Sequence, residues 1–470
     1  MTTGDSVRAP YRNIKRWIDE IGPEALDKKR REAETIFRKV GITFCVYGEG
    51  GDPERLIPFD MIPRIFSASE WEELARGIEQ RAIALNKFLW DVYHDAEIVE
   101  AGIVPGDLIF ENDSYQPLMK DIDPPAGVYS HIIGIDIVRV GDNDFYVLED
   151  NCRTPSGVSY MLENREIMMQ LFPDLFENDA IEPVEDYPSK LYATLRSVKP
   201  PLCEGEPTLA ILTPGPFNSA FYEHSFLADE MGVELVEGPD LYVEDDRVYM
   251  RTTTGPRRVD VIYRRIDDDY IDPKNFRSDS ILGVPGIFDA YRAGGVTLVS
   301  APGAGIADDK AIYTYVPDMI RHYLNEEPIL KNVDTWRCRD EADRAYVLEN
   351  IADLVVKDVH GSGGYGLLIG PHASDAERAA FAKKIEAAPE RYIAQPTLAL
   401  STCPTLSGDA LASRHVDLRP FALVGAGEDG CSVSMTPGGL TRVALREGSL
   451  VVNSSQGGGV KDTWVLNGSG

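Results

Sequence analysis

"LVVKDVHGSGGYGLLIG", residues 354–370, is the stretch on which the expected fold depends. The spacing Gly361-x-Gly363-x-x-Gly366 matches a dinucleotide fingerprint, but that fingerprint needs its glycines to end a strand and begin a helix, because the pyrophosphate sits on the helix N-terminus. Here a second short apolar run, "GLLIGP", follows the glycines, and the next helix is predicted only from Ser374. The order strand, glycine loop, strand favours a lid over the phosphates of ATP and disfavours an NAD site.

Lys357 ends the apolar run "ADLVVK" just before these glycines. Alternation along a strand would point its ammonium toward a pocket beside the loop, where a phosphate would meet it. The other interpretation is a solvent-facing lysine on an edge strand next to a glycine-rich turn, and the spacing alone leaves both open.

The stretch "FYVLEDNCR" carries candidate metal ligands. Glu149 and Asn151 share one face of a predicted strand because they are two residues apart. Asp136 lies on the preceding strand of a predicted hairpin and would face them. Two carboxylates and an amide oxygen suit Mg²⁺, which neutralises phosphate charge, while Arg153 would hold a γ-phosphate or an acyl-phosphate oxygen. The alternative is a solvated turn or a helix cap.

The charge balance limits the possible partners. The chain has 470 residues, 77 of them acidic and 47 basic, which gives a net charge of −30. Nonspecific binding to nucleic acid or to an anionic membrane surface is therefore not expected. A nucleotide would have to be held by a few placed cations, a divalent metal and backbone N–H groups. The length allows two or three packed units.

Cysteine usage and hydropathy indicate a cytoplasmic protein. The six cysteines form no C-x-x-C pair, which argues against a zinc ribbon and a disulfide scaffold. No apolar run approaches membrane-spanning length, and the first residues lack the apolar core of a secretory signal. Cys152 has no signature of a partnered histidine and is left without a role.

The order of the predicted elements indicates a mixed α/β chain. Helices are expected at "YRNIKRWIDEI", "EALDKKRREAETIFRKV" and "SASEWEELARGIEQRAIALNKFLWDVYHD". From "TLAILTP" to "VTLVSAPG", strands and helices alternate around the hairpin "LYVEDDRVYMR", which predicts a small unit with a largely parallel sheet. One helix, "DDKAIYTYVPDMIRHYL", opens the last third, which then becomes rich in strands.

Several blocks, taken with this order of parts, carry a resemblance to a known family: "VLEDNCRTPSGVSYMLENR", "GVPGIFDAYRAGGVTL", "VDLRPFALV", "MTPGGLTRVA" and "SSQGGGVKDTWVL". From about Asp60 to Trp464 the chain resembles the circularly permuted ATP-grasp proteins, in which the metal-binding half precedes the nucleotide-clamping half. It looks like their bacterial type 2 group and is more distantly similar to glutathionylspermidine synthetase and eukaryotic-type glutathione synthetase. It departs from those synthetases at the lid, "HGSGGYG", and around Lys310.

The resemblance implies a role for each matching residue. Contacts to ATP are implied for Lys310 and Lys357 at the phosphates, for Gly361, Ser362, Gly363, Gly364 and Gly366 as the lid, and for Gln395 near the adenine hinge. Mg²⁺ would be held by Asp136, Glu149 and Asn151. Arg153 and the strand residues Arg419 and Arg442 would face the reacting phosphates. Taken singly, Lys310 could equally be a surface helix lysine and Arg442 a charge at a strand end.

The expected fold is α/β (α+β), a circularly permuted ATP-grasp fold with an inserted small parallel unit like a pre-ATP-grasp domain. Residues 1–200 would hold the N-terminal helices and the metal-binding half, 201–305 the inserted α/β unit, and 306–470 the nucleotide-clamping half. In "YRRIDDDYIDP", Arg264 and Arg265 could meet an acidic substrate or equally pair with Asp267 to Asp269 across a turn, and the default expectation is a structural role.

The leading functional hypothesis is an ATP- and Mg²⁺-dependent carboxylate–amine ligase that joins small-molecule or peptide substrates through an acyl phosphate. The second hypothesis is a nucleotide-binding scaffold with weak or lost catalysis that acts through partner proteins. NAD-linked oxidoreduction, the third, requires a helix directly after Gly366.

Overall fold

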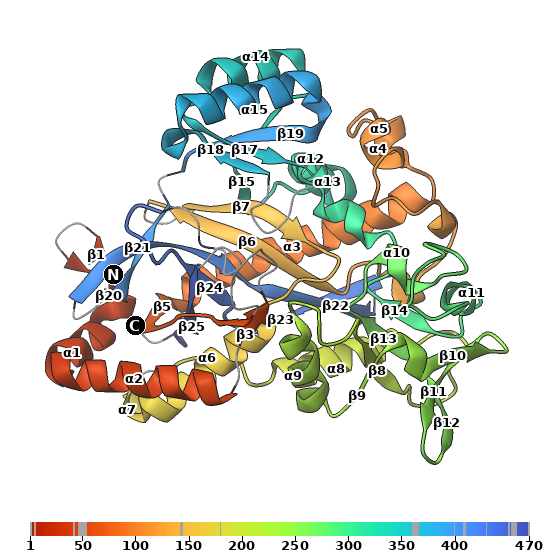
Figure 1. Ribbon diagram of the computed structural model, residues 1–470, viewed down its shortest axis with the longest axis horizontal. Helices are drawn as coiled ribbons and strands as arrows, with labels where there is room; N and C mark the ends of the chain where they lie inside the picture. The colour runs from red at the N-terminus through yellow and green to blue at the C-terminus, as the bar shows by residue number, and fades with distance from the viewer. Residues whose placement is uncertain are drawn as a thin grey trace.

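A large central sheet separates an upper lobe from a lower α/β unit in the computed structural model (Figure 1). The upper lobe comprises residues 336–396 and the lower α/β unit residues 209–299. The structure describes residues 2–3, 6–40, 43–45, 54–141, 144–178, 180–359, 366–398, 400–407, 410–428, 430–449, 452 and 458–468.

The central sheet combines strands from both ends of the chain. Its main path runs in the order β15-β7-β6-β21-β24-β25-β5, with β20 paired to β21 and β22 paired to both β23 and β6. The strands are β5 (Phe59–Phe66), β6 (Ile132–Val140), β7 (Asp144–Asn151), β15 (Lys331–Asn332), β20 (Thr402–Ser407), β21 (Ala410–Arg419), β22 (Phe421–Gly427), β23 (Gly430–Met435), β24 (Leu440–Val443) and β25 (Gly459–Val465). The division into three consecutive domains stays a prediction. In the central sheet, strands from the first and the last of these three parts lie side by side.

The predicted hairpin at the centre of this sheet is confirmed. Strands β6 and β7 pair antiparallel, and β6 also pairs with β21 and β22 on its other side. Apart from Val140, every residue of β6 is buried, because layers cover both faces of this strand. Helix α3 packs behind the sheet against β22 and β23 (Figure 1).

The upper lobe is a four-stranded sheet covered by two helices. Its strand order is β16-β19-β17-β18, with β16 (Trp336–Arg337), β17 (Leu354–Asp358), β18 (Leu367–Ile369), β19 (Tyr392–Pro396), α14 (Glu341–Asn350) and α15 (Asp375–Ala387). A small separate core that includes Val347, Val356 and Ile385 holds these layers together. Because this core is distinct from the two large ones, the lobe packs as a unit of its own.

The lower α/β unit has the parallel sheet that was predicted. Strands β14, β13, β8 and β9 lie in that order, and every pair is parallel. An antiparallel sheet of β10, β11 and β12 projects from it at the lower right (Figure 1). The elements are β8 (Leu209–Leu212), α9 (Phe221–Met231), β9 (Glu234–Val236), β10 (Leu241–Glu244), β11 (Arg247–Thr252), β12 (Gly255–Val259), β13 (Val261–Arg264), α10 (Asp268–Ile271), α11 (Ile287–Arg292) and β14 (Thr297–Val299).

The predicted helices are present, with one correction. The stretch expected as one helix from Asp308 is two, α12 (Lys310–Tyr313) and α13 (Val316–Leu324). Pro317, in the first turn of α13, has no backbone N–H to donate to the Tyr313 carbonyl four residues earlier, which interrupts the helical hydrogen bonds there. The long helix α3 begins at a capping box formed by Ser67 and Glu70. The remaining helices are α1 (Arg12–Ile21), α2 (Pro23–Val40), α3 (Ala68–Tyr93), α4 (Glu97–Glu100), α5 (Asp107–Phe110), α6 (Val158–Leu171), α7 (Pro173–Asn178) and α8 (Tyr187–Ser197).

Candidate nucleotide and metal site

The three candidate metal ligands lie together on the β6–β7 hairpin. Asp136 and Glu149 are direct cross-strand partners, so their carboxylates project from the same face. Asn151 follows on that face two residues later. Its amide nitrogen donates to the carbonyl of Gly134 at 3.1 Å, which orients the amide oxygen as the acceptor end of the group.

Asp136 is held by two arginines from neighbouring strands. The Arg419 guanidinium donates to both carboxylate oxygens, with Nε at 2.5 Å and Nη2 at 2.8 Å. Arg442 Nη2 donates to Asp136 Oδ2 at 2.7 Å, and its Nε donates to Asp417 Oδ1 at 2.9 Å. Burial alone would raise the pKa of Asp136, but the two guanidiniums lower it. Arg419 and Arg442, expected to face phosphates, are therefore engaged with carboxylates of the sheet.

Glu149 is the more accessible carboxylate of the pair. Its side chain is 32% exposed, and Arg419 Nη2 lies 3.8 Å from its Oε1. Removal from bulk water raises the pKa of Glu149, the adjacent Asp136 carboxylate raises it further, and the ammonium groups of Lys310 and Lys357 oppose both effects. Two lysines from beyond residue 300 therefore lie close enough to the hairpin to act on this carboxylate.

Lys357 lies on β17 and approaches the hairpin from the upper lobe. Burial lowers the pKa of Lys357, the ammonium of Lys310 lowers it further, and the carboxylates of Glu149 and Asp136 oppose the decrease. Like charges held this close favour a bound anion, since a phosphate would relieve their repulsion. Lys357 is half-buried, and its contact with a phosphate stays a prediction.

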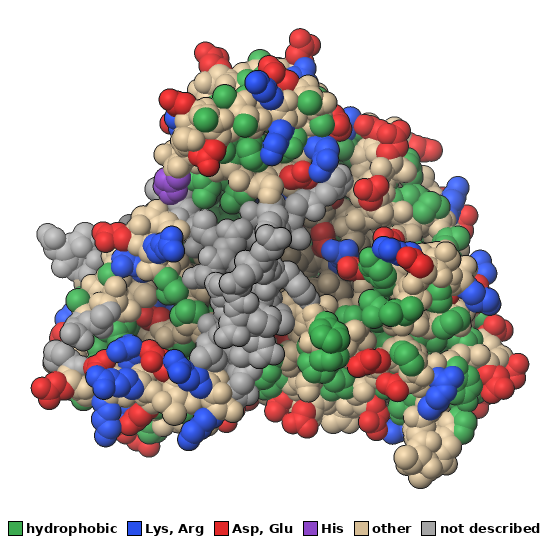
Figure 2. All heavy atoms as spheres, in the orientation of Figure 1, with side chains coloured by type: hydrophobic (Ala, Val, Ile, Leu, Met, Phe, Trp, Pro, Cys, Tyr) green, Lys and Arg blue, Asp and Glu red, His purple; other side chains and the backbone are tan. Residues whose placement is uncertain are grey.

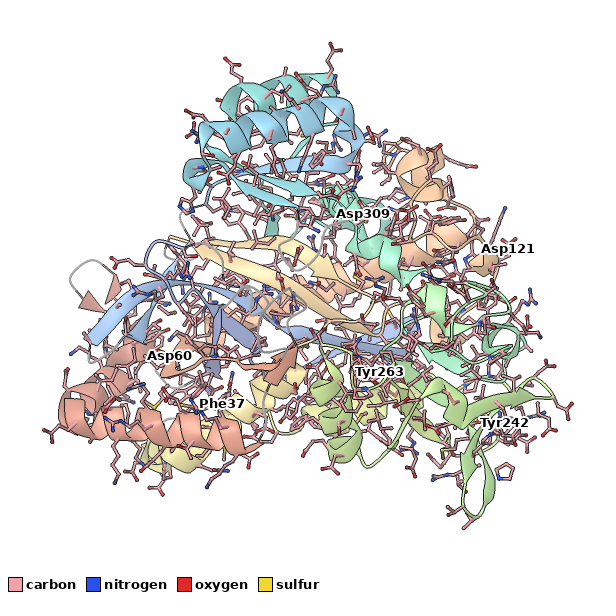
Figure 3. All side chains as sticks on the ribbon, viewed as in Figure 1. Phe37, Asp60, Asp121, Tyr242, Tyr263 and Asp309 are labelled. Atoms are coloured by element: carbon pink, nitrogen blue, oxygen red, sulfur yellow. The ribbon has the colours of Figure 1, made fainter. Side chains whose placement is uncertain are left out.

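Lys310 is the first residue of α12, and Asp309 fixes the start of that helix. Asp309 Oδ1 accepts from the backbone N–H groups of Ala311 at 2.7 Å and Ile312 at 3.1 Å. Its other oxygen accepts from Asn112 Nδ2 at 3.0 Å. Asp309 lies between the upper lobe and the central sheet (Figure 3), so this cap presents Lys310 where the two meet.

The glycine stretch closes a hairpin, as its sequence indicates. Strand β17 pairs antiparallel with β18, and the next α-helix begins only after Ser374, which caps it. Gly366 has a φ of +73° and ends the loop. A helix directly after Gly366 is absent from the described chain, which removes the dinucleotide fingerprint. The lid residues Gly361, Ser362, Gly363 and Gly364 lie outside the described residues.

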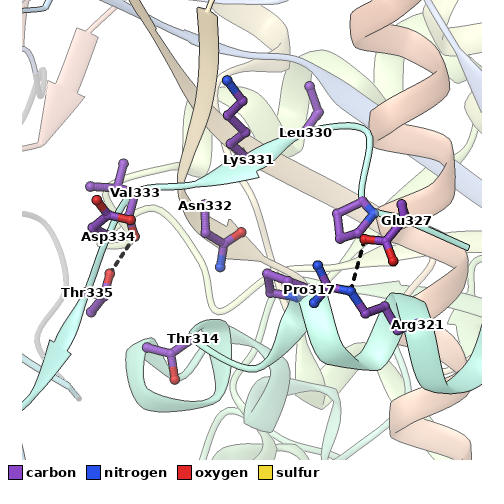
Figure 4. A pocket seen from close by; sticks show the side chains of 11 residues that line it. Thr314, Pro317, Arg321, Glu327, Leu330, Lys331, Asn332, Val333, Asp334 and Thr335 are labelled. Atoms are coloured by element: carbon purple, nitrogen blue, oxygen red, sulfur yellow. Dashed lines mark hydrogen bonds and ion pairs between the residues drawn. The ribbon is translucent and has the colours of Figure 1, made fainter.

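Gln395, expected near an adenine hinge, lies on β19 opposite Val355. Its side chain is buried, and its Nε2 donates to Thr335 Oγ1 at 3.0 Å. Thr335 also lines a cavity of about 380 Å³ between α13 and β15 (Figure 4). The face in Figure 2 is hollowed between the upper lobe and the lower right of the molecule, with acidic and basic side chains at the edge.

Arg153, which follows β7, links this strand to the lower α/β unit. Its Nη1 lies 3.1 Å from Asp267 Oδ1, and its Nε lies 3.6 Å from Asp308 Oδ2. Burial raises the pKa of Asp308 to about 6, although Arg153 and two backbone N–H groups act in the opposite direction. Arg153 therefore stands between two carboxylates, and Asp267 and Asp308 join the site without having been predicted. Their signal was the run of aspartates after Arg265 and the aspartate pair before Lys310.

The two arginines of "YRRIDDDYIDP" are buried and make structural contacts. Arg264 is buried and donates to the carbonyls of Ser300, Ile266 and Ala301, and it pairs with Asp268. Arg265 is buried and pairs with Glu223 on α9. The expected pairing with the aspartates that follow is thus made by Arg264 alone.

No group of three His, Cys, Asp or Glu side chains suited to a metal occurs in the described part of the chain. On the β6–β7 hairpin, Asp136 and Glu149 supply carboxylate oxygens, and the third oxygen donor of the candidate set is the amide of Asn151. Across the same residues, no helix is long and apolar enough to cross a bilayer. Cys152 is fully buried directly after this set.

A carboxylate hairpin on a central sheet, with Lys310 on α12 and Lys357 in the upper lobe, fits the ATP-grasp class of proteins. Residues 63–444 match the family model described as circularly permuted ATP-grasp type 2. The chain belongs to this family.

Relatives and a solved structure agree with this assignment. The chain is 54% identical over 453 residues to an uncharacterized protein of Synechocystis sp., covering 96% of this chain and 93% of that one. A Frankia alni protein with the provisional name glutamate–cysteine ligase 2-3 is 43% identical over 465 residues, which cover 98% of this chain and 52% of that protein. The apo structure of a glutathione synthetase-like effector from Globodera pallida matches with a TM-score of 0.61 at 12% identity, covering 94% of this chain and 98% of that one.

Proposed function

We propose that the protein is an ATP- and Mg²⁺-dependent carboxylate–amine ligase that works through an acyl phosphate. The observation that carries this proposal is the pairing of Asp136 with Glu149 across the β6–β7 hairpin, where the positive charges of Lys310 and Lys357 act on Glu149. These groups come from three segments far apart in the chain. A triphosphate with its metal would satisfy the carboxylates and the ammonium groups at once.

The donor set fits Mg²⁺. Glu149 and Asn151 would supply a carboxylate and an amide oxygen, and Asp136 would contribute while it remains bonded to Arg419. The pKa of Glu149 is raised by burial and by the neighbouring Asp136 carboxylate. A bound cation would oppose this increase, because it stabilises the charged form of the carboxylate. When bound, the metal would supply positive charge that stabilises the phosphates.

Other residues would bind ATP and stabilise the transferred phosphoryl group. Lys310 and Lys357 would bind the phosphates, the loop Gly361–Gly366 would cover them, and Gln395 would border the adenine. Arg153 would stabilise the transferred phosphoryl group. Arg419 and Arg442 would act on the site through Asp136.

Two chemical steps follow. A substrate carboxylate oxygen attacks the γ-phosphorus of ATP, forming an acyl phosphate and releasing ADP. The amine nitrogen then attacks the acyl carbon, phosphate leaves, and the nitrogen loses a proton to give the amide. The protein contributes alignment and charge stabilisation and needs no side-chain nucleophile.

The relatives suggest the substrate class. The Frankia name points to amino-acid substrates such as glutamate and cysteine, although the match covers 52% of that protein. Small amino acids, γ-glutamyl peptides and amines are therefore the first substrates to test, including the pair used by glutathionylspermidine synthetase. We place the reaction in the cytoplasm, where ATP and these metabolites occur.

The experiment is ATP-dependent phosphate release with pools of such acids and amines in the presence of Mg²⁺. We expect Glu149→Gln and Lys357→Met each to lower the rate by about 100-fold or more. Glu386→Gln and Lys383→Met, at exposed positions of α15, are the matched controls. If both site variants turn over like the wild type, the site assignment is wrong. ATP binding without product from any pool would favour the scaffold hypothesis.

A further inference from the structure

A buried arginine lies behind the candidate metal ligands. Arg81 on α3 is 1% exposed and donates to both oxygens of Asp150, with Nε at 2.6 Å and Nη2 at 2.7 Å. Asp150 stands between Glu149 and Asn151 on β7. Because side chains alternate along a strand, Asp150 points to the opposite face, so Arg81 anchors the strand from the side away from the ligands.

The same guanidinium reaches a third segment. Arg81 Nη1 donates to Asn332 Oδ1 on β15 at 2.8 Å, and Asn332 Nδ2 donates to the Tyr313 carbonyl at 2.9 Å. The guanidinium also lies 5.5 Å from the centroid of the Tyr313 ring. Arg81 and Asn332 therefore connect β7 to the last residue of α12.

Tyr313 also contacts β7, the strand that carries Glu149 and Asn151. Its hydroxyl donates to the Val147 carbonyl on β7 at 2.5 Å and accepts from the Val333 N–H at 2.9 Å. Helix α12 is only one turn long and begins at Lys310. Fixing Tyr313 at its end therefore fixes Lys310 at its start, since a hydrogen-bonded turn is stiff.

These contacts touch none of the reacting groups, yet they join the elements that carry them. Glu149 and Asn151 sit on β7 and Lys310 on α12. Thr335, which follows β15, receives the hydrogen bond of Gln395. We propose that Arg81, Asn332 and Tyr313 form a positioning hub that sets the separation between the metal ligands and Lys310. This inference rests on the proposed function, because it assumes that a magnesium–ATP complex spans the two.

Asn332 is the best place to test the hub. It lines the cavity in Figure 4, so a substitution there has room. Asn332→Leu removes both hydrogen bonds, while the buried Arg81 keeps its ion pair with Asp150. Lys331→Leu is the matched control on the same strand: Lys331 is 60% exposed and pairs with Asp144. Tyr313→Phe removes only the hydroxyl and serves as the second variant if Asn332→Leu does not fold.

The measurement is calorimetric titration of ATP with and without Mg²⁺, alongside thermal unfolding of each variant without nucleotide. We expect Asn332→Leu and Tyr313→Phe to reduce the gain in ATP affinity that Mg²⁺ confers by about 10- to 100-fold, and Lys331→Leu to keep the full gain. A purely structural role would lower the unfolding temperature and leave the gain intact, and that result overturns the inference.

The outcome for the wild type separates the two proposals. If the wild-type protein shows no magnesium-dependent ATP binding, the proposed function fails and this inference fails with it. If the wild type shows the gain and both folded variants retain it, the hub alone is refuted.

Discussion

Replacing Asp308 by asparagine is expected to stabilise the ligand-free protein at neutral pH. Asp308 Oδ1 accepts from the backbone N–H groups of Cys152 and Arg153, and an asparagine side-chain oxygen would accept the same two bonds. The substitution removes the charge that burial disfavours and, with it, the attraction to Arg153, which the raised pKa already includes. The neutral side chain therefore reproduces the protonated form of Asp308.

The sign follows from the raised pKa. Burial raises the pKa of Asp308 from 3.8 to about 6. As pH rises between these values the unfolded chain loses this proton before the folded chain does, so stability falls through that interval and the cost is constant above it. At about 1.4 kcal/mol per pH unit, the interval corresponds to roughly 3 kcal/mol. Below about pH 4 the carboxyl is neutral in both states and the cost disappears.

The assay is urea unfolding of wild type and Asp308→Asn between about pH 4 and about pH 7. The difference in unfolding free energy is expected to be near zero at about pH 4 and to reach roughly 3 kcal/mol in favour of the variant at about pH 7. Asp353→Asn, at an exposed position, controls for loss of a negative charge. A difference that stays flat with pH, or a variant less stable than wild type at neutral pH, would refute the reasoning.

Three further substitutions test other parts of the site. Asp136→Asn leaves Arg419 without its bidentate partner, so we expect a loss of about 3–5 kcal/mol in unfolding free energy; an unchanged urea midpoint would contradict it. Gly366→Ala places a side chain at a φ of +73° and 3.0 Å from the Asp358 Cβ, which should cost about 1–2 kcal/mol and weaken ATP binding in a titration, whereas unaltered affinity would argue against a role for the loop. Arg153→Gln should keep ATP affinity and lower the rate of phosphate release by about 100-fold, and an unchanged kcat would remove Arg153 from the chemistry.

Short-range sequence patterns were sufficient to predict the individual strands, helices and turns. The strand, glycine loop and strand around Gly366 were readable because an apolar run bounded by Gly and Pro follows the loop, and Ser374 marks where the next helix starts. The two-residue spacing placed Glu149 and Asn151 on one face, and the turn residues after Val140 indicated the hairpin that sets Asp136 opposite Glu149. These signals act over a few residues, where backbone geometry alone decides the outcome.

Local pattern misjudged the partners of several charged groups. Arg419 and Arg442 look like free cations in the sequence, but strand order brings both to Asp136. Asp267 follows Arg265 and suggests a local pair, yet its partner is Arg153. Arg81 carried no sequence signal, since a lone arginine within an amphipathic helix is usually exposed.

The sequence by itself determined the types and order of the elements, the hairpin of carboxylates, and the lysine beside a glycine loop, because each depends on periodicity and turn chemistry within one segment. Only the tertiary structure decided that the charges of Lys310 and Lys357 act on Glu149, that Arg419 and Arg442 pair with Asp136, and that Arg81 and Asn332 tie β7 to α12. Those contacts join residues far apart in the chain, and they depend on the register and order of strands in a sheet built from both ends of the protein.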